Sequence, residues 1–218
     1  KTGETMSLDT AKKAVDLAYI LREKSACVSY FGGEPLLTFE LIRQITDYAS
    51  SAAERHGKAM FFRLATNGLL LNDEILGFCR EHAIPLALSL DGDPQNHDAQ
   101  RPLADGTSSF AVLDTKLDAI LNSGIRAVAV GVITPVIVER FYDGVLYLWN
   151  RGFRLFAHQP AFDDPSWRPE HLVALETQYR RLANFYEARA KDGENFHLSL
   201  FDNRIDSHLH GEKARPAD

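Results

Sequence analysis

Short apolar runs alternate with segments of helical periodicity along this chain. Five runs rich in β-branched, aromatic and small apolar residues predict strands, at residues 26–31, 59–65, 85–90, 127–133 and 155–158. The segments around them place apolar residues at helical spacing and predict helices, at residues 8–24, 38–55, 72–80, 110–121, 137–150 and 172–185. Ser7 and Asn72 are suited to begin two of these helices, and Gly124 is suited to end another.

Strands that alternate with helices predict right-handed parallel crossover units. A doubly wound sheet and a (β/α) barrel both fit this pattern. The motifs GGEP, ATNG, SLDG, VITP and HQPA each stand at the C-terminal end of a predicted strand, the rim where a parallel barrel builds its site. A dinucleotide-binding fold would instead carry G-x-G-x-x-G after its first strand, and the sequence lacks that run. We therefore expect an α/β fold of barrel type. Five strands cannot close a full barrel, so either the barrel is partial, or strands are missing from this chain, or both.

Composition narrows the class of protein. The chain has 218 residues, 45% of them hydrophobic, which suffices for one sizeable core and favours one domain over two. Its net charge of −6, from 24 basic and 30 acidic side chains, argues against nucleic acid or an anionic membrane as the main partner. No apolar run is long enough to cross a bilayer, and we expect a cytoplasmic protein. Cys27 and Cys79 are too few for a disulfide framework or a four-sulfur site, and both are predicted to be buried free thiols.

The first predicted strand runs directly into Gly32, Gly33, Glu34 and Pro35. The two glycines permit positive φ and leave backbone amides and carbonyls accessible to a small polar ligand. Glu34 adds a carboxylate suited to an ammonium group, and Pro35 prevents the strand from continuing. A plain Gly-Gly loop capped by a solvated glutamate explains the motif equally well.

The third predicted strand ends at Ser89 in SLDG, and Arg101 follows twelve residues later. A hydroxyl and a guanidinium together suit a carboxylate, since arginine offers two parallel donors. Taken alone, the segment is better explained by an arginine that pairs with Asp91 or Asp98 within its own loop.

The other strand ends give weaker signals. Asn67 lies in an Asn-Gly turn signal, so turn formation is its simplest explanation and contact with a ligand the second. The backbone of residues 134–135 and 158–160 could border a purine, although turn formation explains their prolines equally well. His208 and His210 resemble a metal-binding pair but have no third ligand nearby, and a solvated tail explains them better. Because successive strand ends offer an ammonium site, a turn and a carboxylate site, the residues predict a rim site for an amino-acid moiety.

FGGEPLL, LATNGLLL and SLDGDPQNHDAQRP followed by DGTSSF occur in this order on successive predicted strands. In this combination the chain resembles the radical S-adenosylmethionine (SAM) enzymes, in particular the peptide- and protein-modifying branch with a C-terminal SPASM auxiliary-cluster domain. The resemblance implies a partial (β/α)₆ TIM-like barrel that binds SAM and a [4Fe-4S] cluster at its C-terminal rim. It also implies reductive cleavage of SAM to a 5′-deoxyadenosyl radical, which abstracts hydrogen from substrate.

The resemblance also assigns roles to residues of this sequence. Gly32, Gly33 and Glu34, with Pro35 closing the motif, match the segment that receives the methionyl ammonium. Ser89 and Arg101, with Asp91 in the same motif, match the group that holds the methionyl carboxylate. Asn67 matches a position near the site, and three strand-end positions match the surroundings of adenine: Val132, Thr134 and His158.

Two features depart from the family pattern. The C-x-x-x-C-x-x-C loop that holds the cluster is absent, and we expect that this piece starts after the first strand and that loop, with the cluster ligands outside it. We expect residues 1–192 to form the barrel and residues 193–218 to be an extension that leads to an auxiliary-cluster domain outside the chain. Phe31 stands where sulfatase maturases carry Gln, which moves the resemblance towards ribosomal-peptide maturases.

The resemblance implies a peptide or protein substrate and a reducing electron donor as partners, and no nucleic acid or membrane. Residues 153–167 mix aromatic and polar side chains beside a strand end and would suit an extended peptide, although core packing explains them equally well. The truncated chain alone is expected to be inactive. Two alternatives remain open: a degenerate, non-catalytic barrel that binds peptides, and an ordinary (β/α) hydrolase or lyase whose motifs coincide by chance.

Overall fold

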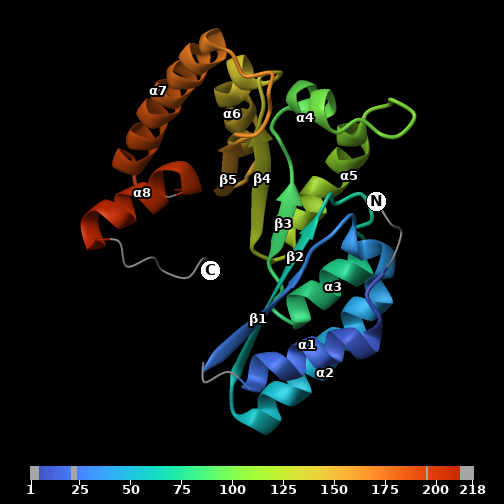
Figure 1. Ribbon diagram of the computed structural model, residues 1–218. Coiled ribbons are helices and arrows are strands. Elements are labelled where there is room, and N and C mark those ends of the chain that lie inside the picture. Colours follow the sequence, from blue (N-terminus) through green and yellow to red (C-terminus); the bar gives the residue numbers. More distant parts are fainter. Residues whose placement is uncertain (1–4, 21–23, 195, 212–218) are drawn as a thin grey trace. The chain divides into compact units, whose positions relative to one another are not determined.

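The computed structural model describes residues 5–20, 24–194 and 196–211, and alternates helices with strands along the chain (Figure 1). The elements of its first half are α1 (Leu8–Ile20), β1 (Ser25–Tyr30), η1 (Pro35–Thr38), α2 (Phe39–His56), β2 (Ala59–Thr66), α3 (Asp73–Glu81), β3 (Leu86–Ser89) and α4 (Pro94–Gln100). Those of its second half are α5 (Ser109–Asn122), β4 (Ala127–Ile133), η2 (Val138–Arg140), α6 (Phe141–Arg151), β5 (Leu155–Pro160), α7 (Pro169–Lys191), β6 (His197–Leu198) and α8 (Ser199–His210).

The strands are parallel and follow the order of the chain, from β1 to β6. Ser25 lies opposite Ala59 in the ladder of β1 and β2, and Leu155 lies opposite His197 in that of β5 and β6. The five predicted strands are confirmed within a few residues at their ends. The sixth was missed because β6 has only 2 residues, too few to show a period.

Several helix ends agree with the sequence prediction. Ser7 Oγ accepts a hydrogen bond from the Thr10 amide at 3.1 Å, and Asn72 Oδ1 accepts one from the Ile75 amide at 2.9 Å. Gly124, with φ of 76°, follows α5 as expected. The helix predicted to reach residue 24 is wrong at its end: α1 stops at Ile20, residues 21–23 lie outside the described residues, and Lys24 is not helical.

The chain divides into two compact units, which we describe one at a time. The first comprises residues 1–88 and 116–126. Its helices α1, α2 and α3 cover strands β1 and β2 from one side (Figure 1), and its core includes the fully buried Leu64 and Leu86. Residues of β1 alternate between the two faces, so that Cys27 shares the exposed face with Ser25 and Ser29. The prediction that Cys27 is buried is therefore wrong, whereas Cys79 in α3 is buried as predicted.

The second unit comprises residues 89–115 and 127–218. Its core is aromatic, with Phe141, Phe153 and Phe156 fully buried. The stripe predicted for the last long helix is only partly internal: Leu182 is buried in α7, but Leu172 remains 58% exposed.

The two C-terminal histidines lie in a helix and not in a tail. His208 and His210 belong to α8, and His210 Nδ1 lies 2.9 Å from Asp206 Oδ1 one helical turn earlier. Across residues 5–20, 24–194 and 196–211, no three His, Cys, Asp or Glu side chains gather where they could hold a metal ion. Within the same residues, no helix is both long and apolar enough to cross a membrane.

Candidate functional site

Glu34 ties the end of β1 to the end of β2 within the first unit. Its Oε1 accepts hydrogen bonds from the Leu36 amide at 3.1 Å and from Thr66 Oγ1 at 2.7 Å. Its Oε2 accepts the Asn67 amide at 2.9 Å. Because Glu34 also caps η1, one carboxylate fixes the turn after β1 against the turn after β2. The glutamate is therefore built into the scaffold, in contrast to the solvated residue that one interpretation of the sequence required.

Gly32 and Gly33 leave bare backbone next to this anchor. Both are exposed, and a Cβ added at either position would meet no heavy atom within 4 Å. Neither has positive φ, so the left-handed conformation that glycine permits is not used here. Neither backbone strain nor packing requires glycine at these positions. Accessibility of the backbone to a ligand is the remaining physical reason for it. Pro35 begins η1, where its missing amide costs nothing.

The side chain of Asn67 stabilises the turn in which Asn67 itself lies. Its Oδ1 accepts the Leu69 amide at 2.9 Å, and Gly68 follows with φ of 79°. The side chain is thus placed as turn chemistry predicts, and only the backbone amide of Asn67 reaches Glu34.

A cavity of about 810 Å³ runs along β1 and opens beside the Gly32–Gly33 turn. Apolar side chains of α1 and α2 line much of it, Val15 and Leu41 among them, together with the exposed Cys27. Its volume falls within the range of small-molecule sites. Phe31, next to the glycines, is 82% exposed.

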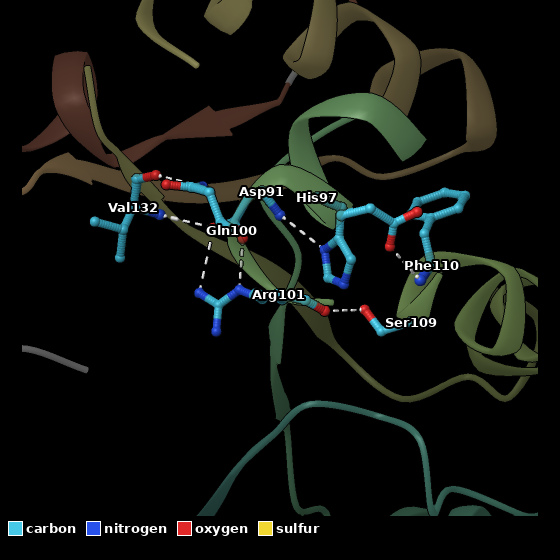
Figure 2. Close-up of polar contacts among 8 residues, drawn as sticks. Asp91, His97, Gln100, Arg101, Ser109, Phe110 and Val132 are labelled. Carbon is cyan, nitrogen blue, oxygen red and sulfur yellow. Dashed lines mark hydrogen bonds and ion pairs between the residues drawn. The ribbon is translucent and has the colours of Figure 1, made fainter. Parts of the chain in front are cut away.

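In the second unit, Arg101 is held by the buried Asp91 (Figure 2). Arg101 Nε donates to Asp91 Oδ2, and Nη2 donates to Oδ1 at 3.2 Å. The Asp91 side chain is fully buried, and that of Arg101 is 35% exposed. Asp91 is placed inside the scaffold, where its carboxylate faces Arg101. The expected pairing of Arg101 with Asp91 within its own loop is therefore present, and Asp98 makes other contacts.

Beyond the end of β3, side chains of the following segment take the place of a neighbouring strand and bond to the backbone of β4. The Leu90 amide donates to the Val130 carbonyl at 2.8 Å, after which the chain turns away. Two residues further along β4, the Val132 amide donates to Asp91 Oδ1 at 2.9 Å, and the Val132 carbonyl accepts from Gln100 Nε2 at 3.0 Å. Both backbone groups of Val132 are thus engaged by the segment that carries Arg101 (Figure 2).

The main chain of Arg101 is fixed as firmly as its side chain. Its amide donates to the His97 carbonyl at 2.8 Å, and its carbonyl accepts from Ser109 Oγ. His97 Nδ1 accepts the Asp91 amide at 3.5 Å, and burial lowers the pKa of this imidazole. Asp98 caps α5 by accepting the Phe110 amide at 2.9 Å.

These supporting residues were not assigned roles from the sequence. The sequence feature that could have indicated their roles is the run NHDAQR, in which polar side chains follow one another on a short helix. Only the fold shows that their partners lie on β4 and α5. The same holds for the ion pair between Asp93 and Arg140, whose oxygen and nitrogen are 2.9 Å apart.

The ring of His158 packs among aromatic side chains of the second unit. His158 shares a face of β5 with Phe156, packs against Phe141 of α6 with ring centroids 5.5 Å apart, and is 1% exposed. Neither ring nitrogen makes a hydrogen bond to another described residue. Burial lowers the pKa of His158 to about 4, against the opposing charge of Asp91.

The remaining strand-end residues differ in their exposure and in whether their polar groups have partners within the protein. Ser89 is half-buried at the last position of β3. Thr134 follows β4, and its buried Oγ1 has no hydrogen-bond partner in the described part of the chain. Of the aromatic residues expected to line a peptide, Phe153 and Phe156 belong to the core, and Phe162 is 85% exposed.

Each unit, taken by itself, offers groups suited to a polar ligand, and the described residues do not gather the ligands of an iron–sulfur cluster. In the first unit the backbone at Gly32 and Gly33 is exposed, and in the second unit the guanidinium of Arg101 is partly exposed. The two cysteines lie on different elements, Cys27 on β1 and Cys79 in α3, where burial raises the pKa of the thiol to about 12. A cluster would require several thiolates at one place.

The sequence of this chain is similar to those of several known proteins. No protein-family model matches it. A cysteine-type anaerobic sulfatase-maturating enzyme of Clostridium novyi (strain NT) is 26% identical over 217 residues, which is 94% of this chain and 56% of that protein. A radical SAM cyclopropyl synthase, TigE of Paramaledivibacter caminithermalis, is 22% identical over 104 residues, which is 48% of this chain and 21% of that protein.

This chain is a relative of the radical SAM enzymes. A solved structure described as native anSMEcpe with bound AdoMet superimposes with a TM-score of 0.88 at 16% identity, covering 99% of this chain and 61% of that one. Streptococcus suis SuiB bound to precursor peptide SuiA gives 0.58 at 14% identity, covering 87% of this chain and 42% of that one. At these identities the solved structures show the fold alone. They confirm the expected α/β fold of partial-barrel type, in which six parallel strands, one more than predicted, alternate with helices. The chain spans 56% of the sulfatase-maturating relative.

Proposed function

We propose that this chain is the core of a radical SAM enzyme that modifies a peptide or protein. In the proposed reaction, SAM accepts one electron from a reducing donor, and its sulfur–C5′ bond breaks to give methionine and a 5′-deoxyadenosyl radical. That radical takes a hydrogen atom from a carbon of the substrate, which leaves 5′-deoxyadenosine and a substrate radical. A [4Fe-4S] cluster, with ligands outside the described residues, would relay the electron.

The observation that carries the proposal is the turn after β1. Glu34 is held by three hydrogen bonds from Leu36, Thr66 and Asn67, while Gly32 and Gly33 stay exposed. A rigid anchor next to unshielded backbone is suited to bind the ammonium of an amino-acid moiety. We assign Gly32 and Gly33 to direct contact with the methionyl ammonium, and Glu34 to holding them in place.

The methionyl carboxylate is assigned to Arg101 and Ser89. Arg101→Ala should weaken SAM binding by about 1.5–3 kcal/mol, the usual scale for a charged hydrogen bond. Near the adenine we retain Thr134, whose hydroxyl has no protein partner among the described residues. Val132 is assigned a contact through its side chain, because its amide and carbonyl are engaged within the protein. His158 is assigned a supporting role behind the site, because its ring is buried against Phe141.

A peptide substrate is favoured by the relatives. The solved structures of anSMEcpe and SuiB include complexes with the Cp18Cys peptide and with precursor peptide SuiA. In this chain the exposed Phe31 and Phe162 are candidates for contact with an apolar side chain of such a peptide.

The proposal is tested with the cluster-replete protein that contains this chain, incubated with SAM, a reductant and candidate peptides. Free amino acids and sugars serve as rival substrates, and mass spectrometry follows 5′-deoxyadenosine and modified product together. We expect both to rise together with a peptide. Coupled turnover of a free metabolite, with no peptide modified, would contradict the substrate class. Peptide binding without any 5′-deoxyadenosine would support a non-catalytic binding module instead.

Site variants make the test specific to the turn after β1. Gly33→Ala should weaken SAM binding, because the added methyl group occupies the space assigned to the ligand and touches no protein atom within 4 Å. Gly77→Ala in α3 is the matched control, since a Cβ there also meets nothing within 4 Å. Equal affinity in the two variants would remove Gly33 from the binding site.

A further inference from the structure

We propose that Asp91 is a positioning residue, which holds Arg101 side-on so that the end of its guanidinium stays open for the carboxylate of the bound amino-acid moiety. This inference rests on the proposed function and adds a role for a buried residue that does not itself touch the ligand. Asp91, Arg101 and the residues that hold them all belong to the second unit.

The side-on contact leaves one edge of the guanidinium available. An arginine side chain offers five N–H donors in a planar fork. Asp91 takes the edge formed by Nε and one hydrogen of Nη2. The edge formed by Nη1 and the second Nη2 hydrogen makes no hydrogen bond to the described residues, and Figure 2 shows the third nitrogen of Arg101 pointing away from the other residues drawn. A second carboxylate can bind there with two parallel bonds.

Asp91 is itself held on several sides, which is what a positioning residue requires. Its side chain is fully buried, and Oδ1 accepts the Val132 amide at 2.9 Å in addition to the arginine. Its own amide points to His97 Nδ1 at 3.5 Å. Rotation of the carboxylate would leave the Val132 amide and the guanidinium without partners, at the cost of three partly buried hydrogen bonds.

The backbone of Arg101 is fixed by the same network. Its amide and carbonyl are bound by the His97 carbonyl and Ser109 Oγ, and the neighbouring Gln100 binds the Val132 carbonyl. With both ends held, the guanidinium loses its rotational freedom when the protein folds and not when the ligand binds. Preorganisation of this kind strengthens binding without any new contact.

A simpler explanation is that Arg101 only neutralises a buried carboxylate. That role predicts an effect on folding but none on which ligand is bound. The distinguishing quantity is therefore the ratio of affinities for SAM and for decarboxylated SAM, a probe that lacks the carboxylate and keeps the rest of the molecule.

The experiment measures this ratio by equilibrium binding to the protein that contains this chain, prepared identically for every variant. The wild-type protein should prefer SAM, and Arg101→Ala should lower the preference by about tenfold or more. Asp91→Asn should lower the preference for SAM towards the Arg101→Ala value. The new NH2 group is a hydrogen-bond donor facing another donor on Arg101, so the guanidinium should turn away from its wild-type orientation. Asp143→Asn is the matched control: it removes one carboxylate that pairs with Arg181 at 2.8 Å, and should leave the ratio unchanged.

Arg101→Lys tests the two-sided contact without unpairing Asp91. An ammonium can neutralise Asp91 but cannot offer two opposed edges, so the melting temperature should stay near that of the wild type while the preference for SAM falls. This variant decides the question if Asp91→Asn does not fold. A wild-type ratio in either Asp91→Asn or Arg101→Lys would overturn the positioning role while the proposed function stands. Absence of SAM binding by the wild-type protein would overturn both.

Discussion

Gly131 of β4 lies directly against the ring of His158 on β5. A Cβ built on Gly131 would come within 2.6 Å of His158 Nε2 and within 3.1 Å of the Asp91 Cα. The absence of a side chain at position 131 thus allows β4, a buried imidazole and the Asp91 turn to pack together.

We therefore expect Gly131→Ala to destabilise the protein by about 1–3 kcal/mol, as overpacking of a buried site does. Chemical denaturation measures the change. Gly32→Ala is the control, because a Cβ there meets no heavy atom within 4 Å, and its effect should stay within about 0.5 kcal/mol. Equal effects of the two substitutions would show that the Gly131–His158 contact is not tight in solution.

The buried imidazole should make stability depend on pH. Burial lowers the pKa of His158 from 6.5 to about 4, so the unfolded chain binds a proton more readily than the folded one. Stability from this residue is fully present above pH 6.5 and is lost as the pH falls towards 4. The loss amounts to roughly 3 kcal/mol at most.

His158→Leu removes the titrating group and keeps an apolar side chain between Phe141 and Phe156. Melting temperatures of both proteins between pH 7 and 4 should therefore diverge in slope, the wild type falling more steeply. His97, whose pKa is also lowered by burial, titrates in both proteins and cancels in the comparison. Parallel curves would contradict the prediction.

Glu34→Ala should loosen the turn after β1. It leaves the amides of Leu36 and Asn67 without their acceptor, at a cost of about 1–3 kcal/mol, and should also weaken SAM binding. Thermal unfolding and equilibrium binding measure the two effects. Glu74→Ala serves as the control, since the Glu74 side chain is 66% exposed and its partner among the described residues is the surface residue Arg43. A stable Glu34→Ala protein with normal affinity would remove Glu34 from the site's scaffold.

The two cysteines should differ sharply in reactivity. Cys27 is exposed on β1, whereas Cys79 is buried in α3, and burial raises the pKa of its thiol to about 12. Brief alkylation of the native protein, followed by peptide mass spectrometry, should label Cys27 and spare Cys79 until denaturant is added. Labelling of Cys79 at a similar rate would mean that α3 opens readily.

This chain by itself should not assemble a [4Fe-4S] cluster, because its two thiols lie on different elements and only one is accessible. Reconstitution with iron and sulfide, followed by absorption and EPR spectroscopy, is the measurement. The Cys27→Ser and Cys79→Ser variants are the controls. A stoichiometric cluster signal that disappears in both variants would overturn the prediction.

The sequence by itself determined the fold class and marked candidate site motifs at the ends of strands. Hydrophobic periodicity is a local property, so it located five strands and the helices α1, α2, α3, α5, α6 and α7, but it missed the short α4 and the C-terminal α8. The motifs GGEP and SLDG stand at the ends of β1 and β3. The caps at Ser7 and Asn72 were predictable because the acceptor and the amide lie three residues apart. The 2-residue β6 was not, because its length carries no period.

Only the tertiary structure decided what the individual side chains do. The bond from Glu34 to Asn67 and that from Asp91 to Val132 join residues 33 and 41 positions apart, which no local pattern reveals. Alternation along a strand sorts its side chains onto two faces, but it does not say which face is covered by a helix. Only the fold shows that Cys27 lies on an exposed face and His158 on a buried one. Sequence could name Arg101 as a carboxylate ligand or as the partner of Asp91. The structure shows the pairing with Asp91 and leaves the other edge of the guanidinium open.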